Sequence, residues 1–376
     1  NAKPTDIPTT QQTAQNAKPI PAKYYTDPSV YQHDTEKIFS KNWIYCGRSS
    51  QIAKPGGYFL FEIDGKSIII LRDRQLQARA FYNVCRHRGT RLCTQEHGRF
   101  SQTIQCPYHA WTYRLNGTLT GAPNMHEVTS FKKADYPLHA VAIVEWQGCL
   151  FINLSAQPLP FAEALAPLMG KFTKWQMEKR AVVHRIEYDL QANWKLVFQN
   201  YSECYHCPSL HPALNRLTPY RDSSNDLTEG AILGGPMRFS AGTESMTMSG
   251  RLCATPLPAT GTDERQLAYY YTVFPNMLLS FFPVCVLIHR IERRAPKQSR
   301  VVCEWLFNEN EVAKPDFDPS GAIAFWNMTN LQDWQVSELS QQGICSRAYT
   351  PGPYAELESM IAAWDRHYLQ QMKNGD

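Results

Sequence analysis

Short hydrophobic runs separated by polar and turn-forming residues dominate the first half of the chain. Segments 58–63 (YFLFEI) and 66–72 (KSIIILR) are rich in aromatic and β-branched residues and are joined by Asp and Gly. Such runs are typical of antiparallel strands. The last of them, 148–154 (GCLFINL), is followed at 157–161 by QPLPF, whose two prolines indicate a boundary. The pattern predicts a small all-β domain over residues 45–155.

The second half of the chain mixes helical and strand-like periodicities. A strand (VVHRIEYDL, 182–190) precedes a segment that is helical from about Asn193, and long strand-like stretches run through 230–307. Further helices are predicted over 161–179, 320–342 and 353–372. Together these elements predict an α+β domain over 156–376, in which helices bracket an antiparallel sheet.

The N-terminal region divides into two parts. Residues 1–22 carry four prolines and too little apolar surface to repay the entropy of ordering, so a flexible tail is predicted. Asp27 and Pro28 then start a helical pattern whose apolar face runs to Trp43. Residues 23–44 are therefore predicted to be a helical segment that packs on the second domain.

Residues 269–288 run for 20 positions without a charged side chain, long enough to cross a bilayer as a helix. However, Pro275-Asn276 is a turn signal, and Pro283 interrupts the stretch again. The aromatic and β-branched residues favour two buried strands joined by a turn. We therefore predict no membrane span.

Composition narrows the possible functions. The chain of 376 residues has 38 basic and 34 acidic residues, and its net charge of +4 is too small to indicate binding to nucleic acid or to a membrane surface. Its 11 cysteines are odd in number and scattered, unlike the disulfide framework of a small secreted protein. The N-terminus lacks the basic and apolar segments of a signal peptide, so a cytoplasmic protein of two domains is expected.

Two cysteine–histidine pairs provide the first chemical signal. They lie in VCRHRG and CPYHAW and comprise Cys85, His87, Cys106 and His109. A zinc site usually pairs like residues, whereas here each pair offers one thiolate and one imidazole. Mixed pairs suit a [2Fe–2S] cluster in which two thiolates hold one iron and two imidazoles the other. The pattern resembles the Rieske signature C-x-H…C-x-x-H, and Arg86, Arg88 and Tyr108 are expected to donate hydrogen bonds around the sulfurs.

A second group of potential metal ligands lies in NYSECYHCPSLH (200–211). His206 and His211, with a distant carboxylate, would make the facial triad of a non-haem Fe(II) oxygenase, which leaves positions for O2 and substrate. Two histidines alone are a weak signal, and a Rieske electron carrier without a mononuclear iron is the alternative. Cys204 and Cys207 have no second pair, so we interpret them as packing cysteines rather than as redox or zinc groups.

Segment 200–211 resembles the catalytic segment of Rieske non-haem iron oxygenase large (alpha) subunits. The matching positions are Asn200, Glu203, His206 and His211. The resemblance implies a third iron ligand on a helix near the C-terminus, for which Asp333 is preferred to Glu338. Asn200 and Glu203 are the candidate catalytic residues: Asn200 would lie close to the iron, and Glu203 would link an iron-bound His to a Rieske His of the neighbouring subunit. The alternative role of Glu203 is only to orient His206.

The resemblance covers nearly the whole chain from Tyr24 onward, because the domain order and both motifs fall where the family has them. It implies a Rieske domain followed by a helix-grip (START-like) domain, in which an antiparallel sheet wraps a long helix. It also implies a [2Fe–2S] cluster, a mononuclear Fe(II), O2 as a substrate and a homotrimer. The chain has no G-x-G-x-x-G nucleotide motif, so an NAD(P)H-dependent flavin and iron–sulfur reductase is expected as a separate partner.

Within this family, segment 203–212 (ECYHCPSLHP) resembles the branch that oxidises quaternary ammonium compounds such as betaines and carnitine. Aromatic rings bind such a permanent cation. The candidate cage residues are Tyr269, Tyr270, Tyr271, Phe274, Phe281, Phe282 and Trp326. The same rings would equally serve as core, or stack on the substrate of a ring-hydroxylating or O-/N-dealkylating oxygenase. The leading prediction is oxidative N-demethylation or cleavage of a small quaternary ammonium compound by a mono- or dioxygenase.

Overall fold

The structure, a computed structural model, describes residues 17–256, 261 and 263–373. These residues divide into two compact units. The β unit spans Phe39–Phe161, and the α+β unit combines residues 17–38 with 162–373. The predicted boundary at residue 155 lies a few residues before the end of the β unit, and the predicted helical lead-in belongs to the α+β unit as far as residue 38.

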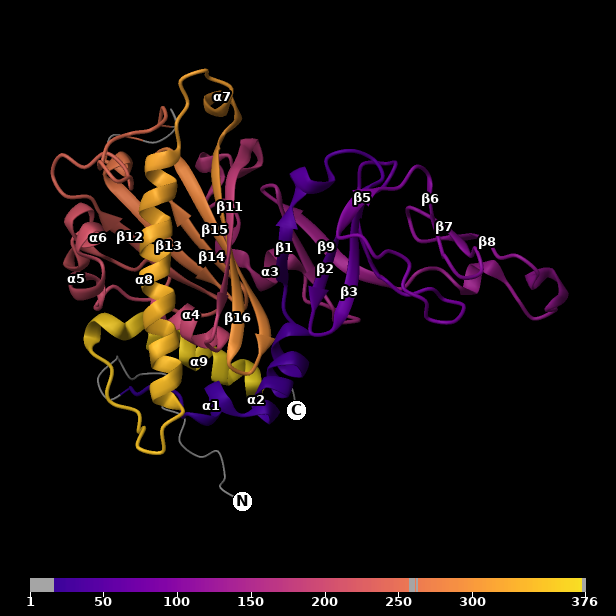
Figure 1. Cartoon of the computed structure of the whole chain (residues 1–376), viewed down its shortest axis with the longest axis horizontal. Helices are drawn as coiled ribbons and strands as arrows, with labels where there is room; N and C mark the ends of the chain where they lie inside the picture. The colour runs from indigo at the N-terminus through magenta and orange to yellow at the C-terminus, as the bar shows by residue number, and fades with distance from the viewer. Residues whose placement is uncertain (1–16, 257–260, 262, 374–376) are drawn as a thin grey trace. The chain divides into compact units, whose positions relative to one another are not determined.

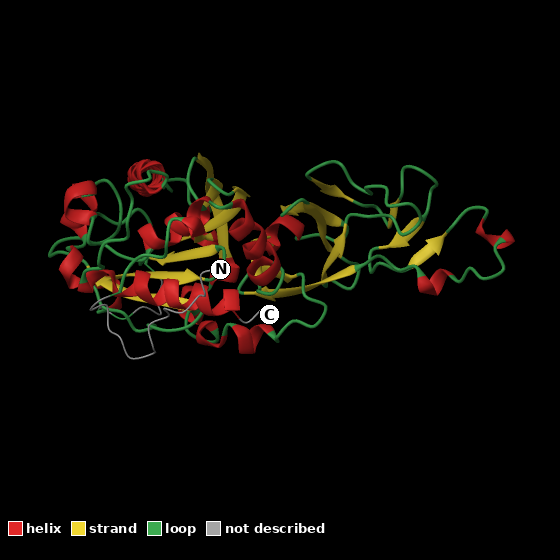
Figure 2. Cartoon of the chain, turned by 90° about the horizontal axis from the view of Figure 1, so that it is seen from below, coloured by secondary structure: helices red, strands yellow, loops and turns green. Residues whose placement is uncertain are grey.

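Short antiparallel strands build the β unit (Figure 1). Its larger sheet has the order β1-β10-β9-β4-β3-β2-β5. These strands are β1 (Ile44–Arg48), β2 (Gly57–Ile63), β3 (Lys66–Arg72), β4 (Ala78–Tyr82), β5 (His97–Arg99), β9 (Ala140–Trp146) and β10 (Cys149–Asn153). The smaller sheet contains β6 (Thr103–Gln105), β7 (Thr112–Arg114) and β8 (Leu119–Gly121). Figure 2 shows that strands and loops make up most of this unit, which confirms that the predicted first domain is all-β.

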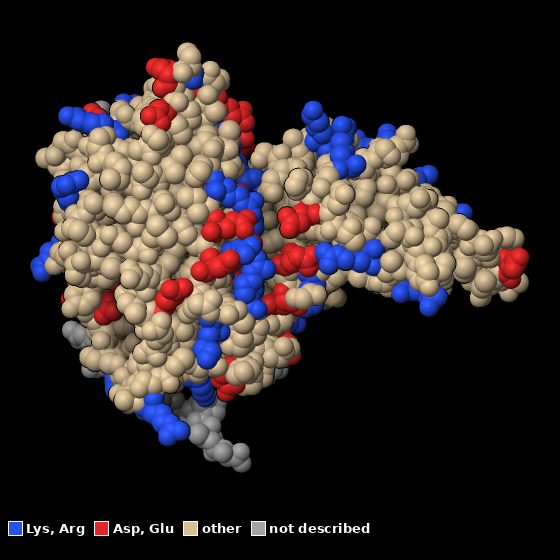
Figure 3. All heavy atoms as spheres, viewed as in Figure 1, with Lys and Arg blue, Asp and Glu red and all other residues tan. Residues whose placement is uncertain are grey.

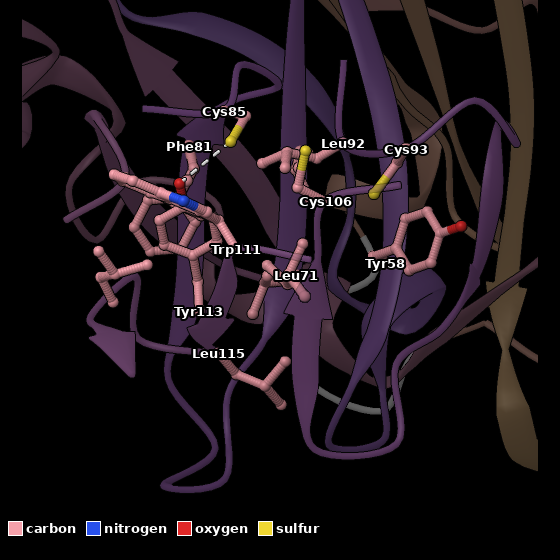
Figure 4. Close-up of a cluster of buried hydrophobic side chains, with 14 residues drawn as sticks. Tyr58, Leu71, Phe81, Cys85, Leu92, Cys93, Cys106, Trp111, Tyr113 and Leu115 are labelled. Carbon is pink, nitrogen blue, oxygen red and sulfur yellow. Dashed lines mark hydrogen bonds between the residues drawn. The ribbon is translucent and has the colours of Figure 1, made fainter. Parts of the chain in front are cut away.

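The core of the β unit combines side chains from both sheets. Leu71 of β3 and Phe81 of β4 come from the larger sheet, and Tyr113 of β7 comes from the smaller one (Figure 4). Cys85 and Cys106 belong to the same buried cluster. The two cysteines are therefore held by packing from both sheets.

A six-stranded antiparallel sheet forms the centre of the α+β unit (Figure 1). Its order is β11-β16-β15-β14-β13-β12. The strands are β11 (Arg180–Leu190), β12 (Ile232–Arg238), β13 (Leu267–Val273), β14 (Met277–Phe281), β15 (Cys285–Ala295) and β16 (Gln298–Asn308). The longer helices are α4 (Trp194–Tyr201), α8 (Ser320–Ile344) and α9 (Ser359–Lys373), and the shorter ones are α5 (Cys207–Leu210), α6 (Pro212–Leu217) and α7 (Glu309–Val312). The sheet with its long helix confirms the predicted helix-grip architecture.

Helix α8 contacts strands toward both edges of the sheet. Asn327 accepts a hydrogen bond from the hydroxyl of Tyr188 on β11 at 2.8 Å. On β13, next to the edge strand β12, Tyr270 packs against Trp326, with ring centroids 6.1 Å apart. The segment of α8 that carries Asp333 is therefore held firmly over the sheet.

The N-terminal lead-in is a broken helix anchored in the α+β unit. It consists of α1 (Lys23–Thr26), α2 (Pro28–His33) and a π-helical turn, η1 (Asp34–Phe39). The fully buried Asp34 pairs with the fully buried Lys195 of α4 at 2.5 Å. Burial lowers the pKa of Lys195 to about 8, although Asp34 opposes that shift. Because an unpaired charge here would be costly, this ion pair fixes the lead-in on α4.

Of the tail predicted over residues 1–22, the structure describes residues 17–22. Residues 1–16 lie outside the described residues. Beyond them, Ile20 is 3% exposed, and the carbonyl of Ala17 accepts a hydrogen bond from the N–H of Tyr354 at 2.9 Å. Residues 17–22 are therefore anchored rather than a free tail, because the buried side chain of Ile20 and several backbone hydrogen bonds hold this proline-rich segment.

The helix predicted over 161–179 was also wrong. The segment contains only α3 (Phe161–Ala164), followed by three 3-10 turns, η5 (Ala166–Leu168), η6 (Thr173–Trp175) and η7 (Met177–Lys179). Pro167 lacks the backbone donor that a helix needs, and Gly170 adopts a positive φ of 76°. These two residues end the helix soon after it starts.

The uncharged stretch 269–288 folds as parts of three strands, β13, β14 and β15, rather than the two predicted. Pro275 and Asn276 form the turn between the first two strands, as predicted. Within the ranges that the structure describes, no helix combines the length and apolar character needed to span a membrane.

Acidic and basic side chains alternate over β11 and β16 (Figure 3). Arg300 pairs with Asp189 and Glu187, and Arg185 also pairs with Glu187. These exposed pairs contribute little stability individually. The surface over β11 and β16 therefore carries both positive and negative charges.

Candidate metal centres

Two loops of the β unit, 85–90 and 106–111, share one backbone design. In each loop the N–H of the first residue donates to the sixth carbonyl, and the fifth N–H donates to the first carbonyl. The bonds are Cys85 to Thr90 (2.8 Å), Gly89 to Cys85 (3.0 Å), Cys106 to Trp111 (2.8 Å) and Ala110 to Cys106 (3.1 Å). The fifth residues, Gly89 and Ala110, both have left-handed backbones, with φ of 76° and 56°. Each loop is thus a tight turn that begins with a cysteine.

The four predicted cluster ligands converge at these loops, with sulfurs inside and imidazoles outside. Cys85 and Cys106 are 2% and 3% exposed, and Figure 4 shows both in the core of the unit. Burial raises the pKa of the Cys85 thiol, and the neighbouring Cys106 adds to that rise. His87 is exposed, and its ring centroid lies 4.8 Å from that of the half-buried His109. Two thiols on one side and two imidazoles on the other suit a Rieske cluster.

Two aromatic residues next to the predicted ligands were missed by the sequence analysis. The Tyr113 hydroxyl lies 3.4 Å from the sulfur of Cys85 (Figure 4). The indole of Trp111 stacks on His87, with centroids 4.9 Å apart and an angle of 11°. Trp111 immediately precedes β7 and Tyr113 lies within it, so the two side chains are two residues apart in an extended segment and point to one side. This two-residue spacing next to the second ligand pair was the sequence signal that could have identified both residues.

The residues predicted to donate hydrogen bonds to the sulfurs contact other groups instead. The Arg86 guanidinium donates to the carbonyl of Pro137 at 2.5 Å. Arg88 lies over the ring of Tyr108, 5.4 Å from its centroid. Tyr113 is therefore the better candidate for a sulfur contact.

In the α+β unit, His206, His211 and Asp333 come together as the sequence predicted. One ligand atom of each lies within 4.8 Å of the others. Asp333 Oδ1 is 2.7 Å from Nε2 of His211 and 3.4 Å from Nε2 of His206. This donor set fits a 2-His-1-carboxylate iron site. Glu338, the competing carboxylate, instead accepts from the N–H of Gln191 at 2.8 Å.

The other nitrogen of each imidazole has its own partner. Nδ1 of His206 is 2.5 Å from Oε1 of Glu203, and Nδ1 of His211 is 2.7 Å from Oε1 of Gln332. Both oxygens can accept an Nδ1–H, which leaves the Nε2 lone pairs for a metal. Within this chain, Glu203 thus bonds His206 rather than His211. Gln332, the neighbour of Asp333 on α8, was missed because its role depends on the fold.

The ligand segment is not the continuous helix that was predicted. Helix α4 ends at Tyr201, and residues 202–206 form an irregular bend. His206 and His211 stand at the N-terminal ends of α5 and α6. Both short helices have a proline in their first turn, which suits a helix start because that position needs no backbone donor.

Cys204 and Cys207 form a disulfide across the bend that carries His206. Both border the same cavity as the three predicted iron ligands. The interpretation of this pair as packing cysteines was therefore wrong. It treated them as helical neighbours, whereas the chain is not helical at Cys204.

The charges at the triad favour a cation. Burial lowers the pKa of His206, but hydrogen bonds to Asp333 and Glu203 outweigh this effect and raise the pKa to about 10. Burial raises the pKa of Asp333, but hydrogen bonds from His206 and His211 bring it below its usual value. The two carboxylates thus stabilise positive charge where a metal would bind.

A cavity of about 120 Å³ lies beside the triad. A single water needs roughly 10–15 Å³, so the cavity has room for several such groups. The predicted candidate Asn200 lines it together with Glu203. Tyr270 of β13 and Trp326 of α8 also line it. Trp326 precedes Asp333 by seven positions, which places both on one face of the helix.

Of the seven aromatic residues considered for a cage, Tyr270 and Trp326 line this cavity. Phe282 packs behind both of them, 5.9 and 5.3 Å away between ring centroids. The others have partners in the core: Tyr269 with Trp175, Tyr271 with Phe172, Phe274 with Trp364, and Phe281 with Phe172. For these four residues, the alternative reading as core is the better one.

Two family models match the chain. Residues 42–132 match the Rieske [2Fe-2S] domain, and residues 177–374 match the ring hydroxylating alpha subunit (catalytic domain). The glycine betaine monooxygenase oxygenase subunit of Chromohalobacter salexigens is 33% identical over 365 residues, covering 89% of this chain and 81% of that protein. The carnitine monooxygenase oxygenase subunit of Escherichia coli (strain K12) is 37% identical over 203 residues, covering 54% of each chain.

The fold agrees with these matches. The structure of a quaternary ammonium Rieske monooxygenase, described in relation to carnitine oxidation by gut microbiota and inter-subunit electron transfer, superimposes with a TM-score of 0.81. It is 25% identical in sequence, and the match covers 96% of this chain and 97% of that one. The chain therefore belongs to the ring-hydroxylating alpha subunits of the Rieske non-haem iron oxygenases, which bind a Rieske [2Fe–2S] cluster and a mononuclear iron.

Proposed function

We propose that this oxygenase hydroxylates an N-methyl carbon of a small quaternary ammonium compound and so removes that carbon as formaldehyde. The observation that carries the proposal is the cavity beside His206, His211 and Asp333, which has an aromatic wall of Tyr270 and Trp326. Among the described residues that line it there is no Lys or Arg. Aromatic faces without a competing cation suit a permanently charged ammonium group. The names of the glycine betaine and carnitine monooxygenase relatives support the same substrate class.

The residues present fit both metal groups. Cys85, His87, Cys106 and His109 would hold the [2Fe–2S] cluster, and His206, His211 and Asp333 would hold Fe(II). When bound, these groups store electrons and activate O2 so that one oxygen atom enters a C–H bond. Overall, the N-methyl compound, O2, two electrons and two protons give an N-hydroxymethyl compound and water. That product then splits into formaldehyde, a demethylated amine and a proton.

The chain's own side chains orient the ligands and position the substrate. Glu203 and Gln332 accept the Nδ1 hydrogens of His206 and His211 and so fix both rings with Nε2 toward the metal position. Asn200 borders the cavity next to this position. The aromatic wall holds the ammonium group and keeps water away from it.

We further propose that electrons come from a separate NAD(P)H-dependent flavin and iron–sulfur reductase and cross between subunits of a homotrimer. Glu203 and His206 also border a second cavity of the α+β unit, with Tyr25 and Tyr354. A Rieske histidine of a neighbouring subunit could approach Glu203 from that side. The inter-subunit electron transfer named for the solved relative supports this arrangement.

A single-turnover assay tests the substrate class. The iron-loaded protein is reduced without oxygen, mixed with O2, and formaldehyde is measured with glycine betaine, carnitine, tetramethylammonium or naphthalene. We expect formaldehyde with at least one ammonium compound and no oxidised naphthalene. A hydroxylated arene, with no formaldehyde from any ammonium compound, would instead favour the ring-hydroxylating alternative.

A further inference from the structure

We propose that one end of the β unit is the docking surface for the electron donor and that it selects a donor with an acidic face. The surface, here named the basic patch, consists of Lys54, Arg74, Leu76 and Arg99. This inference rests on the proposed function, since the donor is the proposed iron–sulfur reductase. It gives that partner a place on this chain and a sign of charge.

The β unit is far more basic than the rest of the chain. Residues 39–161 contain 14 Lys and Arg against 7 Asp and Glu, a net charge of +7. The remaining residues contain 24 against 27, a net charge of −3. The small total charge therefore hides a strongly basic unit. A field of one sign attracts a partner of the opposite sign and raises its rate of association.

Three cations of this unit gather where β2 begins and where β3 and β5 end. Lys54, Arg74 and Arg99 are exposed, and none of them makes an ion pair with a described residue. The guanidinium of Arg99 donates to the carbonyl of Pro55, next to Lys54, at 3.0 Å. That of Arg74 donates to the carbonyl of Ser101, two residues beyond Arg99, at 3.3 Å. Figure 3 shows Lys and Arg side chains gathered at this end of the unit.

No acidic side chain of the same segments neutralises this charge. Segments 49–57, 72–77 and 97–102 contain a single carboxylate, Asp73. Asp73 is fully buried, accepts hydrogen bonds from the N–H groups of Gln75 and Gln77, and pairs with Arg79 at 2.8 Å. The positive charge of the patch therefore remains available to a partner.

Leu76 adds an apolar contact point that the folded chain does not explain. It lies in the turn between β3 and β4, two residues after Arg74, and is 59% exposed. Its backbone is left-handed, with φ of 60°, a conformation that disfavours a bulky side chain and suits Gly or Asn. The exposed side chain gains little burial to offset this strain. A partner that covers Leu76 would supply the missing apolar contact.

Arg72 holds the parts of the patch together. Its guanidinium donates to the carbonyl of Ile52 at 3.1 Å and to that of Leu76 at 3.2 Å. Glu145 pairs with Arg72 at 2.9 Å, so this cation is neutralised and buried below the patch. The turn with Leu76 and the segment before β2 are thereby fixed to each other. A preformed surface loses less entropy when a partner binds.

The patch adjoins the core that contains the predicted cluster thiols. Phe100, next to Arg99, stacks on Tyr58 with ring centroids 4.3 Å apart. Tyr58 belongs to the same buried cluster as Cys85 and Cys106. The patch residues lie outside loops 85–90 and 106–111, so a donor bound here leaves the imidazoles of those loops to the neighbouring subunit. One electron leaves the donor and enters the Rieske cluster, and no bond is made or broken.

A donor with a four-thiolate [2Fe–2S] cluster fits the sign of this charge. In such a cluster the negative charge of the thiolates and sulfides exceeds the positive charge of the irons. Redox partners form small and transient contacts, for which three cations and one apolar side chain suffice. A nucleic acid is the poorer match, because DNA-binding surfaces contact roughly 6–10 phosphates.

Charge reversal at the patch tests the inference. A plant-type [2Fe–2S] ferredoxin with an acidic surface is reduced chemically and mixed with the oxidised holoenzyme, and stopped-flow absorbance follows reduction of the Rieske cluster. We expect the second-order rate constant to fall about tenfold in Lys54→Glu and in Arg74→Glu at low salt. The difference should vanish near 1 M salt, where the screening length is about 3 Å.

Lys132→Glu is the matched control, because it makes the same change of charge at an exposed residue of the β unit outside the patch. It should change the rate constant less than about twofold at low salt. The visible spectrum of the cluster should be the same in all variants. Lys54 makes no side-chain hydrogen bond or ion pair with a described residue, so its reversal removes no contact of the fold.

Leu76→Gly separates docking from folding. Loss of the side chain should raise the Kd of the oxidised ferredoxin about fivefold, measured by calorimetry. The melting temperature should not fall, because glycine accepts the left-handed backbone. A leucine with only a structural role would give the opposite pair of results.

Reversal variants that are reduced as fast as Lys132→Glu would overturn the inference, as would a wild type whose reduction does not slow with salt. Variants that lose affinity for a short DNA duplex and not for the ferredoxin would assign the patch to nucleic acid instead. The test contains no substrate. Formaldehyde release by the chemically reduced enzyme therefore decides the proposed function separately.

Discussion

The two metal centres are built on different length scales. The cluster loops of the β unit each close on themselves through the same two backbone hydrogen bonds, and all four ligands lie within segment 85–109. The triad of the α+β unit joins a histidine segment to Asp333, which lies 122 residues beyond His211 and is positioned by α8 against the sheet. A local motif therefore specifies the first centre, whereas packing of the whole unit specifies the second.

The largest effect is expected from a substitution in a cluster loop, which should remove one metal centre and leave the other. Cys85→Ser removes one thiolate and should abolish the visible spectrum of the [2Fe–2S] cluster and all turnover, while the mononuclear iron stays bound. Visible absorption and iron analysis on the same sample check this result. Cys93→Ser, at a buried cysteine outside both loops, is the control and should keep the cluster. Loss of the mononuclear iron in Cys85→Ser would show that the centres are not independent.

A smaller effect is expected at the carboxylate that bonds His206. Glu203→Gln keeps the size of the side chain but removes its charge, so kcat should fall about 10- to 100-fold with little change in KM. Steady-state turnover and the rate of cluster reoxidation by O2 measure this loss. Glu358→Gln is the control and should remain active. Burial raises the pKa of Glu358, and the nearby charge of Glu203 raises it further, so this second acidic residue lies close to the first. Equal activity of the two variants would exclude a special role for Glu203.

A further step down is expected at Gln332, which holds the other imidazole. Gln332→Leu leaves His211 Nδ1 without its acceptor and should weaken iron binding about tenfold, in the range known for such outer partners. Iron affinity is measured by competition with a chelator. Gln335→Leu, at an exposed position of the same helix, should bind iron normally. Unchanged iron affinity in Gln332→Leu would show that Gln332 is not needed to orient His211.

The smallest effect concerns pH and the stability of the α+β unit. Asp365 of α9 is buried beside Gln199 and Tyr354, and burial raises its pKa to about 7. Since this folded-state pKa exceeds that of an unfolded aspartate, its contribution to stability is complete below about pH 4 and is lost as the pH rises through about 7. The free energy of unfolding should therefore fall by up to about 2–3 kcal/mol between pH 5 and pH 8.

Urea unfolding of the wild type and of Asp365→Asn at both pH values measures this change. The substitution removes the titrating proton, so most of the pH dependence should disappear. Asp189→Asn, at an exposed aspartate, should retain it. A slope that is the same in all three proteins would contradict the assignment to Asp365.

The sequence predicted those parts of the molecule whose causes are local. The strands of the β unit, the ends of α8 and the cysteine–histidine loops follow from short patterns of apolar and turn residues. The tight loops even reuse one hydrogen-bond design with Gly89 in one and Ala110 in the other. Asp333 was chosen from the family resemblance and not from its spacing, because no local pattern connects it to His206.

Other features depend on contacts that the sequence does not display. Gln332 and Tyr113 gain their roles only when strands and helices bring them to an imidazole or a sulfur. The bend at Cys204 was missed because the helical pattern from Asn193 gave no sign that α4 ends at Tyr201. Likewise, the sequence could not show that Tyr270 lines the cavity whereas Tyr269 and Tyr271 do not. All three are apolar positions of one uncharged strand, so the pattern does not indicate which side faces the cavity.

Iron and acid-labile sulfide analysis of Asp333→Ala, beside the wild type, tests most directly whether two separate centres are built in these two ways. The wild type should contain about three irons and about two sulfides per chain. Asp333→Ala should lose about one iron, keep both sulfides and the visible cluster spectrum, and lose turnover. Three irons with full turnover in the variant would contradict the proposed triad, and loss of the sulfides would contradict the independence of the two centres.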